Sequence, residues 1–168
     1  MLIAVTPELL RLELTDVDAF AAALGVTLAP DWPPGEYDAD AARFFLEQLT
    51  TLGERIAGWQ SYYVVTRNSK SMPRDLIAAA GFFGPPDEGG TVEIGFSVVE
   101  AWRRRGIATE IVGGLLEHAA VQPGVRRVIA RSRADNRPSH GVLLRNGFRE
   151  VETGDTELRR FEREVGAH

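Results

Sequence analysis

Hydrophobic and polar residues follow two different spacings along the chain. Segments with apolar positions three and four residues apart predict amphipathic helices at 38–56 and 106–120. Three apolar runs rich in β-branched and aromatic residues predict strands at 59–67, 76–84 and 91–99. Polar segments with glycine or proline separate these runs and favour hairpin loops. The middle of the chain therefore predicts an antiparallel meander followed by a helix.

The first forty residues combine one short alternating run with one helical segment. LLRLEL at 9–14 alternates as a strand would, and a helix is expected over 15–25, with Thr15 as its N-cap and Gly25 as its end. The next segment, LAPDWPPGEY at 28–37, holds three prolines and a glycine. That composition predicts a loop.

The last third of the chain predicts a strand, a short helix and a hairpin. The strand is expected at 125–133, the helix at 138–148, and the hairpin strands at 148–152 and 157–164. The resulting order is β-α-α-β-β-β-α-β-α-β-β. This order predicts a mixed α/β (α+β) fold with a mostly antiparallel sheet in one domain, 1–168.

Composition excludes several kinds of chemistry and leaves an uneven charge. The 168 residues include no cysteine, which removes disulfides and thiol nucleophiles, and the three histidines lack metal-ligand spacing, so no metal is expected. Neither a signal peptide nor an apolar run of membrane-spanning length is recognised, so a cytoplasmic protein that binds no membrane is expected. Residues 1–100 hold 6 basic and 15 acidic residues, whereas 101–168 hold 13 and 9.

Three consecutive arginines, Arg103, Arg104 and Arg105, lie between a predicted strand and a predicted helix. A solvated basic corner would explain them, and so would a site for a phosphorylated ligand. Gly106 and Ala108 favour the second interpretation, because small residues let an anion approach the free amides of a helix N-terminus. The turn lacks the spacing of a P-loop and of a dinucleotide fingerprint. The acidic chain and its single basic cluster disfavour nucleic acid.

Two motifs together resemble the GNAT family of N-acetyltransferases. Arg103 to Ala108 match the acetyl-CoA loop pattern [QR]-x-x-G-x-[GA], and ADNRPSHGVLLRNGF supplies the family's asparagine, Asn136, with the Gly147-Phe148 pair that ends a helix. The run TVEIGFSV…WRRRGIATE…NRPSHGVLLRNGF is most similar to the branch that contains the ribosomal-protein alanine acetyltransferases and many small-molecule relatives. The resemblance is good over 59–164 and only general over 9–58.

The resemblance implies a site for acetyl-CoA, used as a cosubstrate. It implies a GNAT-like sheet, splayed between its fourth and fifth predicted strands and flanked by helices on both faces. Backbone amides of 104–109 would bind the pyrophosphate, and Asn136 would bond the pantetheine amide. The residues expected to contact the cosubstrate are Val98, Val99, Arg103, Arg104, Arg105, Gly106, Ile107, Ala108, Thr109 and Asn136.

The catalytic groups are less clearly marked. Many family members carry a tyrosine, the acid that protonates the departing thiol, where this chain has Leu143. Ser139 or water is a candidate donor in its place. Glu93 is the candidate base, because alternation along 91–99 puts it on one strand face with Gly95 and Ser97. A structural, hydrogen-bonded carboxylate would equally explain Glu93, and a helix cap would explain Asn136.

The favoured function is N-acyl transfer from acetyl-CoA to a primary amine, by direct attack in a ternary complex. The acceptor stays open between a small molecule and a protein N-terminus, and a homodimer is compatible with the sequence. The alternative is a non-catalytic acyl-CoA-binding or sensing module, for which Leu143 is the one supporting feature. The acceptor pocket is expected to involve the proline-rich segment, the early helices and the terminal hairpin.

Overall fold

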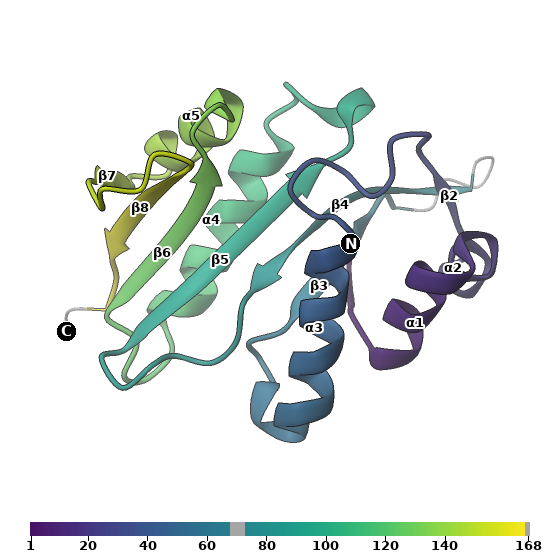
Figure 1. The fold of residues 1–168 in the computed structure, drawn as a ribbon, viewed down its shortest axis with the longest axis horizontal. Helices are drawn as coiled ribbons and strands as arrows, with labels where there is room; N and C mark the ends of the chain where they lie inside the picture. Colours follow the sequence, from purple (N-terminus) through teal and green to yellow (C-terminus); the bar gives the residue numbers. More distant parts are fainter. Residues whose placement is uncertain (68–72, 167–168) are drawn as a thin grey trace.

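The computed structural model describes residues 1–67 and 73–166, and within them eight strands form one sheet (Figure 1). The strands are β1 (Leu2–Ala4), β2 (Val26–Leu28), β3 (Ser61–Val65), β4 (Arg74–Phe82), β5 (Thr91–Val98), β6 (Arg127–Arg133), β7 (Arg149–Val151) and β8 (Leu158–Glu164). The helices are α1 (Pro7–Thr15), α2 (Val17–Leu24), α3 (Ala39–Leu52), α4 (Ile107–Ala120) and α5 (Arg137–Arg145). Two short 3₁₀ turns, η1 (Gly53–Ile56) and η2 (Glu100–Trp102), follow α3 and β5.

The strand order is β1-β3-β4-β5-β6-β8-β7, with β2 added beside β4. All neighbours are antiparallel except β2 with β4 and β5 with β6. The predicted mixed α/β class and the mostly antiparallel sheet are therefore confirmed, as are the three strands of the central meander. Part of the expected loop between β3 and β4, residues 68–72, lies outside the described residues.

Helices cover the two faces of the sheet and bury a separate core on each side (Figure 1). Helices α1, α2 and α3 pack on one face and bury a core that includes Leu10, Phe20 and Tyr63, all three fully buried. Helices α4 and α5 pack on the opposite face over Ile94 and Phe161. In Figure 1, no helix crosses the near face of β6 and β8. That face is open and charged.

Residues 9–14 form part of a helix, so the expected strand there is wrong. Thr6 accepts a hydrogen bond from the Leu9 amide, and Pro7 occupies the first helical position, two start signals that a six-residue alternation conceals. Leu10 faces the core with no exposure. The N-cap of the next helix is Asp16 rather than Thr15, whose hydroxyl donates to the Arg11 carbonyl within α1. Strands β1 and β2, three residues each, lie where no strand was expected.

The parallel pair β5–β6 opens along its length. Registered partners run from Thr91 opposite Arg127 to Ile94 opposite Ala130, and both strands then continue without pairing to each other. Figure 1 shows the ends of the two strands diverging. The expected splay between these strands is confirmed, and it leaves a gap in the sheet beside the N-terminus of α4. Among the described helices, none is long and apolar enough to cross a membrane.

Candidate active site

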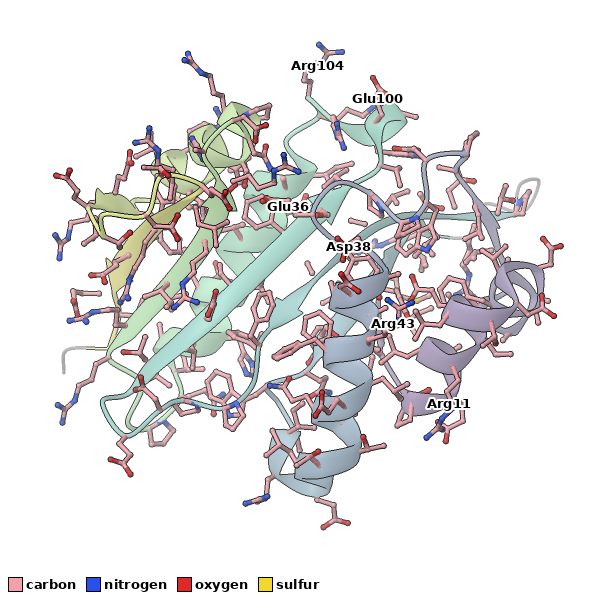
Figure 2. The ribbon with its side chains drawn as sticks, viewed as in Figure 1. Arg11, Glu36, Asp38, Arg43, Glu100 and Arg104 are labelled. Carbon is pink, nitrogen blue, oxygen red and sulfur yellow. The ribbon has the colours of Figure 1, made fainter. Side chains whose placement is uncertain are left out.

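The turn from β5 to α4 holds the backbone in a conformation that side chains rarely adopt. Arg104 has a φ of 58° and Gly106 a φ of 77°, both left-handed. A non-glycine residue in that region stores local strain, which is concentrated at ligand-binding sites. Arg105 is fixed over the Trp102 ring at 4.7 Å, while the Arg104 side chain extends outward from the turn in Figure 2.

Helix α4 begins at this turn without a side-chain cap. The other four α-helices are capped by Thr6, Asp16, Asp38 and Asn136, each accepting a hydrogen bond from a first-turn amide. At α4, Gly106 is the N-cap residue, and among the described residues no side chain caps the first turn. The first-turn amides and the positive end of the helix dipole are therefore open to an anion.

The free edge of β5 faces the splay. The Val99 amide donates to Ile77 and the Phe83 amide donates to Glu93, so the odd-numbered residues of β5 bond to β4. Strand alternation then turns the backbone groups of Phe96 and Val98 toward β6, where pairing has already ended. The Val98 carbonyl accepts from Arg103 Nε at 2.9 Å. The Val99 carbonyl accepts from the Trp102 amide, so both backbone groups of Val99 are engaged. The edge left for a ligand consists of the backbone groups of Phe96 and the amide of Val98.

A loop from the other end of the chain crosses the splay. Gly35 lies against Ser97 of β5, since a Cβ built on it would be 3.5 Å from the serine hydroxyl. Its neighbour Glu36 accepts hydrogen bonds from Ser132 Oγ at 3.2 Å and from the Arg133 amide at 2.7 Å, both on β6. The loop thereby connects the two diverging strands, as the position of Glu36 in Figure 2 shows.

Asn136 and Ser139 lie on the β6 side of the splay. The Asn136 carbonyl oxygen accepts from the Ser139 amide and caps α5, and its amide group donates to Glu36 at 2.9 Å. The cap role is confirmed, whereas contact with a ligand stays a prediction. Leu143, where many relatives of the resembled family have tyrosine, has no exposure and packs in the core under α4. It can take no part in proton transfer.

The comparisons with known proteins agree with this geometry. The family model described as "Acetyltransferase (GNAT) domain" matches residues 8–149. The chain belongs to the GNAT acetyltransferase family. It is 30% identical over 149 residues to YjdG of Bacillus subtilis, an uncharacterized N-acetyltransferase, with 83% of this chain and 85% of YjdG covered. The protein is an acetyl-CoA-dependent N-acetyltransferase of the GNAT family.

Two solved structures share its fold. One is RimL, a ribosomal L7/L12 alpha-N-protein acetyltransferase in complex with coenzyme A, with a TM-score of 0.66, 22% identity and coverage of 99% of this chain and 94% of RimL. The other is the microcin C7 self-immunity acetyltransferase MccE in complex with acetyl-CoA and AMP, with a TM-score of 0.62, 13% identity and coverage of 98% and 91%. Both similarities show that the chain has the fold of these acetyltransferases, and the branch that the motifs implied stays a prediction.

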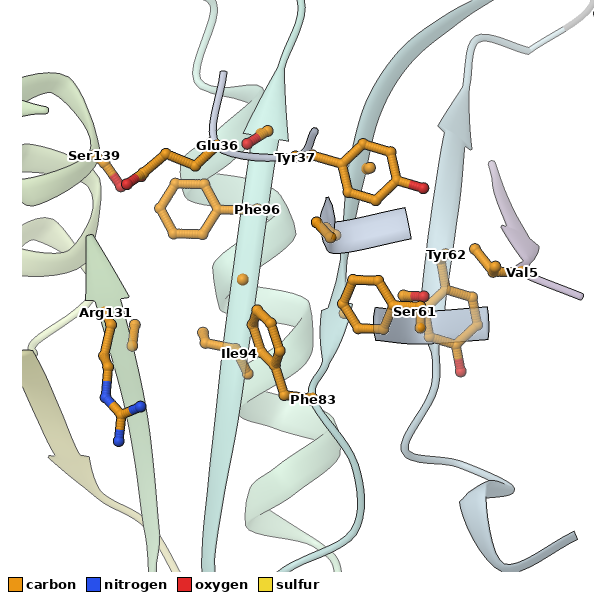
Figure 3. Close-up of a pocket in the computed structure, with 18 residues that line it drawn as sticks. Val5, Glu36, Tyr37, Ser61, Tyr62, Phe83, Ile94, Phe96, Arg131 and Ser139 are labelled. Carbon is orange, nitrogen blue, oxygen red and sulfur yellow. The ribbon is translucent and has the colours of Figure 1, made fainter. Parts of the chain in front are cut away.

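A cavity of about 110 Å³ adjoins the splay of this GNAT sheet, on the α3 side (Figure 3). Its floor consists of small residues of β3, β4 and β5, namely Ser61, Ala79, Gly81, Gly95 and Ser97. Aromatic rings line it as well, from Tyr37, Phe45, Tyr62, Phe83 and Phe96. Its polar side chains include Glu36, Arg131 and Ser139, and in Figure 3 the Glu36 side chain extends toward Ser139. The proline-rich loop and α3 line this cavity, whereas among the described residues α2 and the terminal hairpin do not. That this cavity is the acceptor pocket stays a prediction.

Glu93 lies on the same sheet face but outside the cavity lining. Its carboxylate is 3.7 Å from Arg131 on β6, and its side chain is 25% exposed. Burial raises the pKa of Glu93, while the charges of Arg131 and Arg160 act to lower it. Arg160 in turn is 2.7 Å from Glu162. Glu93 thus belongs to an ion-pair network on the open face of the sheet, and its role as a base stays a prediction.

Sequence reasoning missed the carboxylate that anchors the crossing loop. Glu13 of α1 accepts hydrogen bonds from Trp32 Nε1 at 2.9 Å and from the Tyr37 hydroxyl at 2.8 Å, which fixes both ends of the loop. Tyr63 of β3 donates to the same carboxylate. Burial raises the pKa of Glu13, and the three donors oppose that rise. No local signal marks Glu13, because its partners lie 19, 24 and 50 residues away.

Proposed function

We propose that this GNAT enzyme transfers an acetyl group from acetyl-CoA to a primary amine, by direct attack within a ternary complex. The observation that carries the proposal is the uncapped N-terminus of α4, which opens beside a splayed β5–β6 pair. Together these features suit the two parts of the cosubstrate. The helix terminus suits its pyrophosphate, and the free strand edge suits its pantetheine arm.

The pyrophosphate would lie on the backbone amides of 104–109. A Cβ built on Gly106 meets no atom within 4 Å, so the space in front of the turn is open to a ligand. Arg104 and Arg105 are exposed and can add charge. Arg103 acts differently, because its Nε donates to the Val98 carbonyl and supports the strand edge. Ile107, Ala108 and Thr109 would contribute their amides from the first turn.

The Val98 amide would bond the pantetheine arm as a neighbouring strand would. An amide that faces the gap can also stabilise negative charge on the thioester oxygen during attack. Asn136 lies across the gap, and the amide hydrogen that it does not donate to Glu36 would bond the pantetheine amide. Ser139, next to that cap, would protonate the leaving thiolate. A thiol pKa near 8.5 makes the thiolate a tolerable leaving group even without help.

The acceptor must attack as a free amine. At pH 7 roughly one in ten α-amines and one in 10³ lysine-like amines are neutral, so a base is useful for both. Glu93 would act through ordered water, because it lies outside the cavity and is paired with Arg131. The rise in its pKa through burial brings that carboxyl closer to the range in which a base is efficient.

Release of the coenzyme A thiol tests the transfer. The chain has no cysteine, so a thiol reagent reports only coenzyme A. A panel of glycinamide, leucinamide, spermidine and short peptides should show at least one amine that raises thiol release well above the rate without acceptor. If acetyl-CoA binds but no amine does so, the alternative of a non-catalytic acyl-CoA-binding module is favoured instead.

Direct attack has a second test. With no cysteine in the chain, no thiol can carry the acetyl group. Mass spectrometry after incubation with acetyl-CoA alone should therefore show unmodified protein. A stoichiometric acetyl adduct that is transferred to an added amine would contradict the ternary-complex mechanism and indicate an acyl-enzyme.

A further inference from the structure

Three hydrogen-bond donors of the protein hold the carboxylate of Glu36 at the mouth of the cavity. Ser132, of which only 1% is exposed, donates through its hydroxyl. The Arg133 amide donates to Oε1, and the Asn136 side chain donates to Oε2. Glu36 itself is half-buried. Three donors from two elements thus fix one negative charge in the gap between the diverging strands.

The same carboxylate keeps some capacity for a further partner. An ionised carboxylate offers about four acceptor positions, and the protein fills three of them. Glu36 also lines the cavity, so the remaining position is available to a group bound there. An amine is the natural partner, since an ammonium or amine N–H to a carboxylate is a charge-assisted hydrogen bond.

The position of Glu36 relative to β5 suits an acceptor. The register of the parallel pair, continued past Ile94 and Ala130, places Ser132 and Arg133 opposite Phe96 and Ser97. Glu36 bonds those two β6 residues, so its carboxylate lies across the gap from the free edge of β5. An amine that Glu36 holds would therefore face a thioester bound on that edge.

The cavity beside Glu36 limits the rest of the acceptor. Its aromatic rings and small floor residues are mostly apolar, and its volume is about 110 Å³. A dry cavity of about 150 Å³ takes a benzene molecule. The smaller volume here suits a group smaller than a benzene ring, such as a branched aliphatic group of four carbons.

We infer that Glu36 binds the acceptor amine and that the adjoining cavity receives a compact aliphatic group carried next to it. The inference rests on the proposed function and names its acceptor class: a primary amine with an aliphatic substituent of leucine size. Leucinamide has this chemistry, and glycinamide is the matched probe without the side chain. Burial of a leucine side chain should lower the KM for leucinamide roughly 10- to 100-fold relative to glycinamide.

The first experiment compares Glu36→Gln with the native chain. The variant should raise the KM for leucinamide roughly 10- to 100-fold, the loss expected for one hydrogen bond to a charged group. Its kcat should change less, and its affinity for acetyl-CoA should stay the same. Glu47→Gln is the matched control, because Glu47 is an exposed glutamate of α3 and its loss removes the same charge. Glu36→Asp, which keeps the charge, should recover part of the lost affinity.

The second experiment fills the cavity without changing the carboxylate. Ala41 of α3 lines the cavity, and Ala41→Leu keeps a good helix former there. This variant should lose the preference for leucinamide over glycinamide while it still acetylates glycinamide.

A pentapeptide beginning with leucine distinguishes the two sources of such an amine, which are the N-terminus of a protein chain and a free small molecule. A KM close to that of leucinamide indicates a chain terminus, and a much higher one indicates a free small amine.

Three results would overturn the inference. An unchanged KM for leucinamide in Glu36→Gln would remove Glu36 from the acceptor site. Tighter acetyl-CoA binding in that variant, with the same KM, would show instead that the loop competes with the cosubstrate. Equal KM values for leucinamide and glycinamide in the native chain would reject the cavity as an aliphatic site. Calorimetric titration of leucinamide into the coenzyme A complex of the native chain and of Glu36→Gln tests the same contact without turnover, so it separates this inference from the proposed function.

Discussion

Replacing Gly106 with glutamate tests the proposed pyrophosphate site at the point where the backbone leaves most room. A Cβ at this position meets no atom within 4 Å, so a side chain can start here without a clash. The substitution does strain the backbone, because φ is 77° at this position. An L residue in that region lowers the free energy of unfolding by about 1–2 kcal/mol. Gly106→Ala has the same strain without the charge.

The added carboxylate supplies the effect on the ligand. If this carboxylate lies about 7 Å from one phosphate charge in an effective dielectric of about 20, the repulsion weakens the free energy of binding by about 2.4 kcal/mol. That energy corresponds to an affinity roughly 50-fold weaker, and more if several phosphate charges contribute. Because the effect is electrostatic, it should shrink as salt is raised, whereas the strain in Gly106→Ala should not.

Calorimetric titration with acetyl-CoA measures this difference, and urea denaturation checks that the variants stay folded. Gly154→Glu is the matched control, since Gly154 has a φ of 79° and an equally open Cβ position in the β7–β8 loop. It introduces the same residue in the same conformation away from α4, and it should bind acetyl-CoA as the native chain does. If Gly106→Glu bound acetyl-CoA as tightly as Gly106→Ala, the pyrophosphate would have to lie elsewhere.

Three further changes test other parts of the structure. Gly114→Ala should raise the free energy of unfolding by about 0.5–1 kcal/mol in urea denaturation, because Gly114 is exposed within α4 and its Cβ would meet no atom within 4 Å; a decrease would reveal an unseen constraint. Glu93→Gln should lower kcat/KM roughly 100-fold, and it should remove the loss of activity that the native enzyme shows as pH falls and its base is protonated. If both proteins lose activity in the same way at low pH, Glu93 belongs to the ion-pair network and is not the base. Burial raises the pKa of Glu13 in the folded protein, so its contribution to stability is complete below its unfolded pKa, near 4.3, and is lost as pH rises through the folded value. Glu13→Gln should flatten that part of the curve of unfolding free energy against pH, and an unchanged curve would contradict the burial effect.

The sequence predicted those parts of the site that depend on neighbouring residues. The arginine turn, its glycine and the following helix are contiguous, so their pattern identified the family and predicted the place of an anion site. The helix cap at Asn136 is equally local. In contrast, LLRLEL alternates by chance within α1, and the start signals Thr6 and Pro7 outweigh that alternation.

The residues that define the acceptor side could not be found in this way. Glu36 meets Ser132, Arg133 and Asn136 across 96 to 100 residues, and only the folded sheet brings them together. The composition of the proline-rich segment predicted a loop, but nothing in it specifies where the loop crosses. Glu13 reads as an ordinary acidic residue of an amphipathic segment until Trp32 and Tyr37 are seen to donate to it.

The short pairing of β5 with β6 has a consequence for how the protein survives in a cell. Only four residue pairs join these strands, from Thr91 with Arg127 to Ile94 with Ala130, so the sheet is divided by a partial seam. A cosubstrate that bonds along the open part of β5 would act as the missing strand, and it would bind only the folded chain. Such a ligand at 100 times its Kd adds about 2.7 kcal/mol to the free energy of unfolding. The lifetime of the protein would then follow the supply of its acetyl donor, and a cell short of that donor would lose the enzyme to proteolysis sooner.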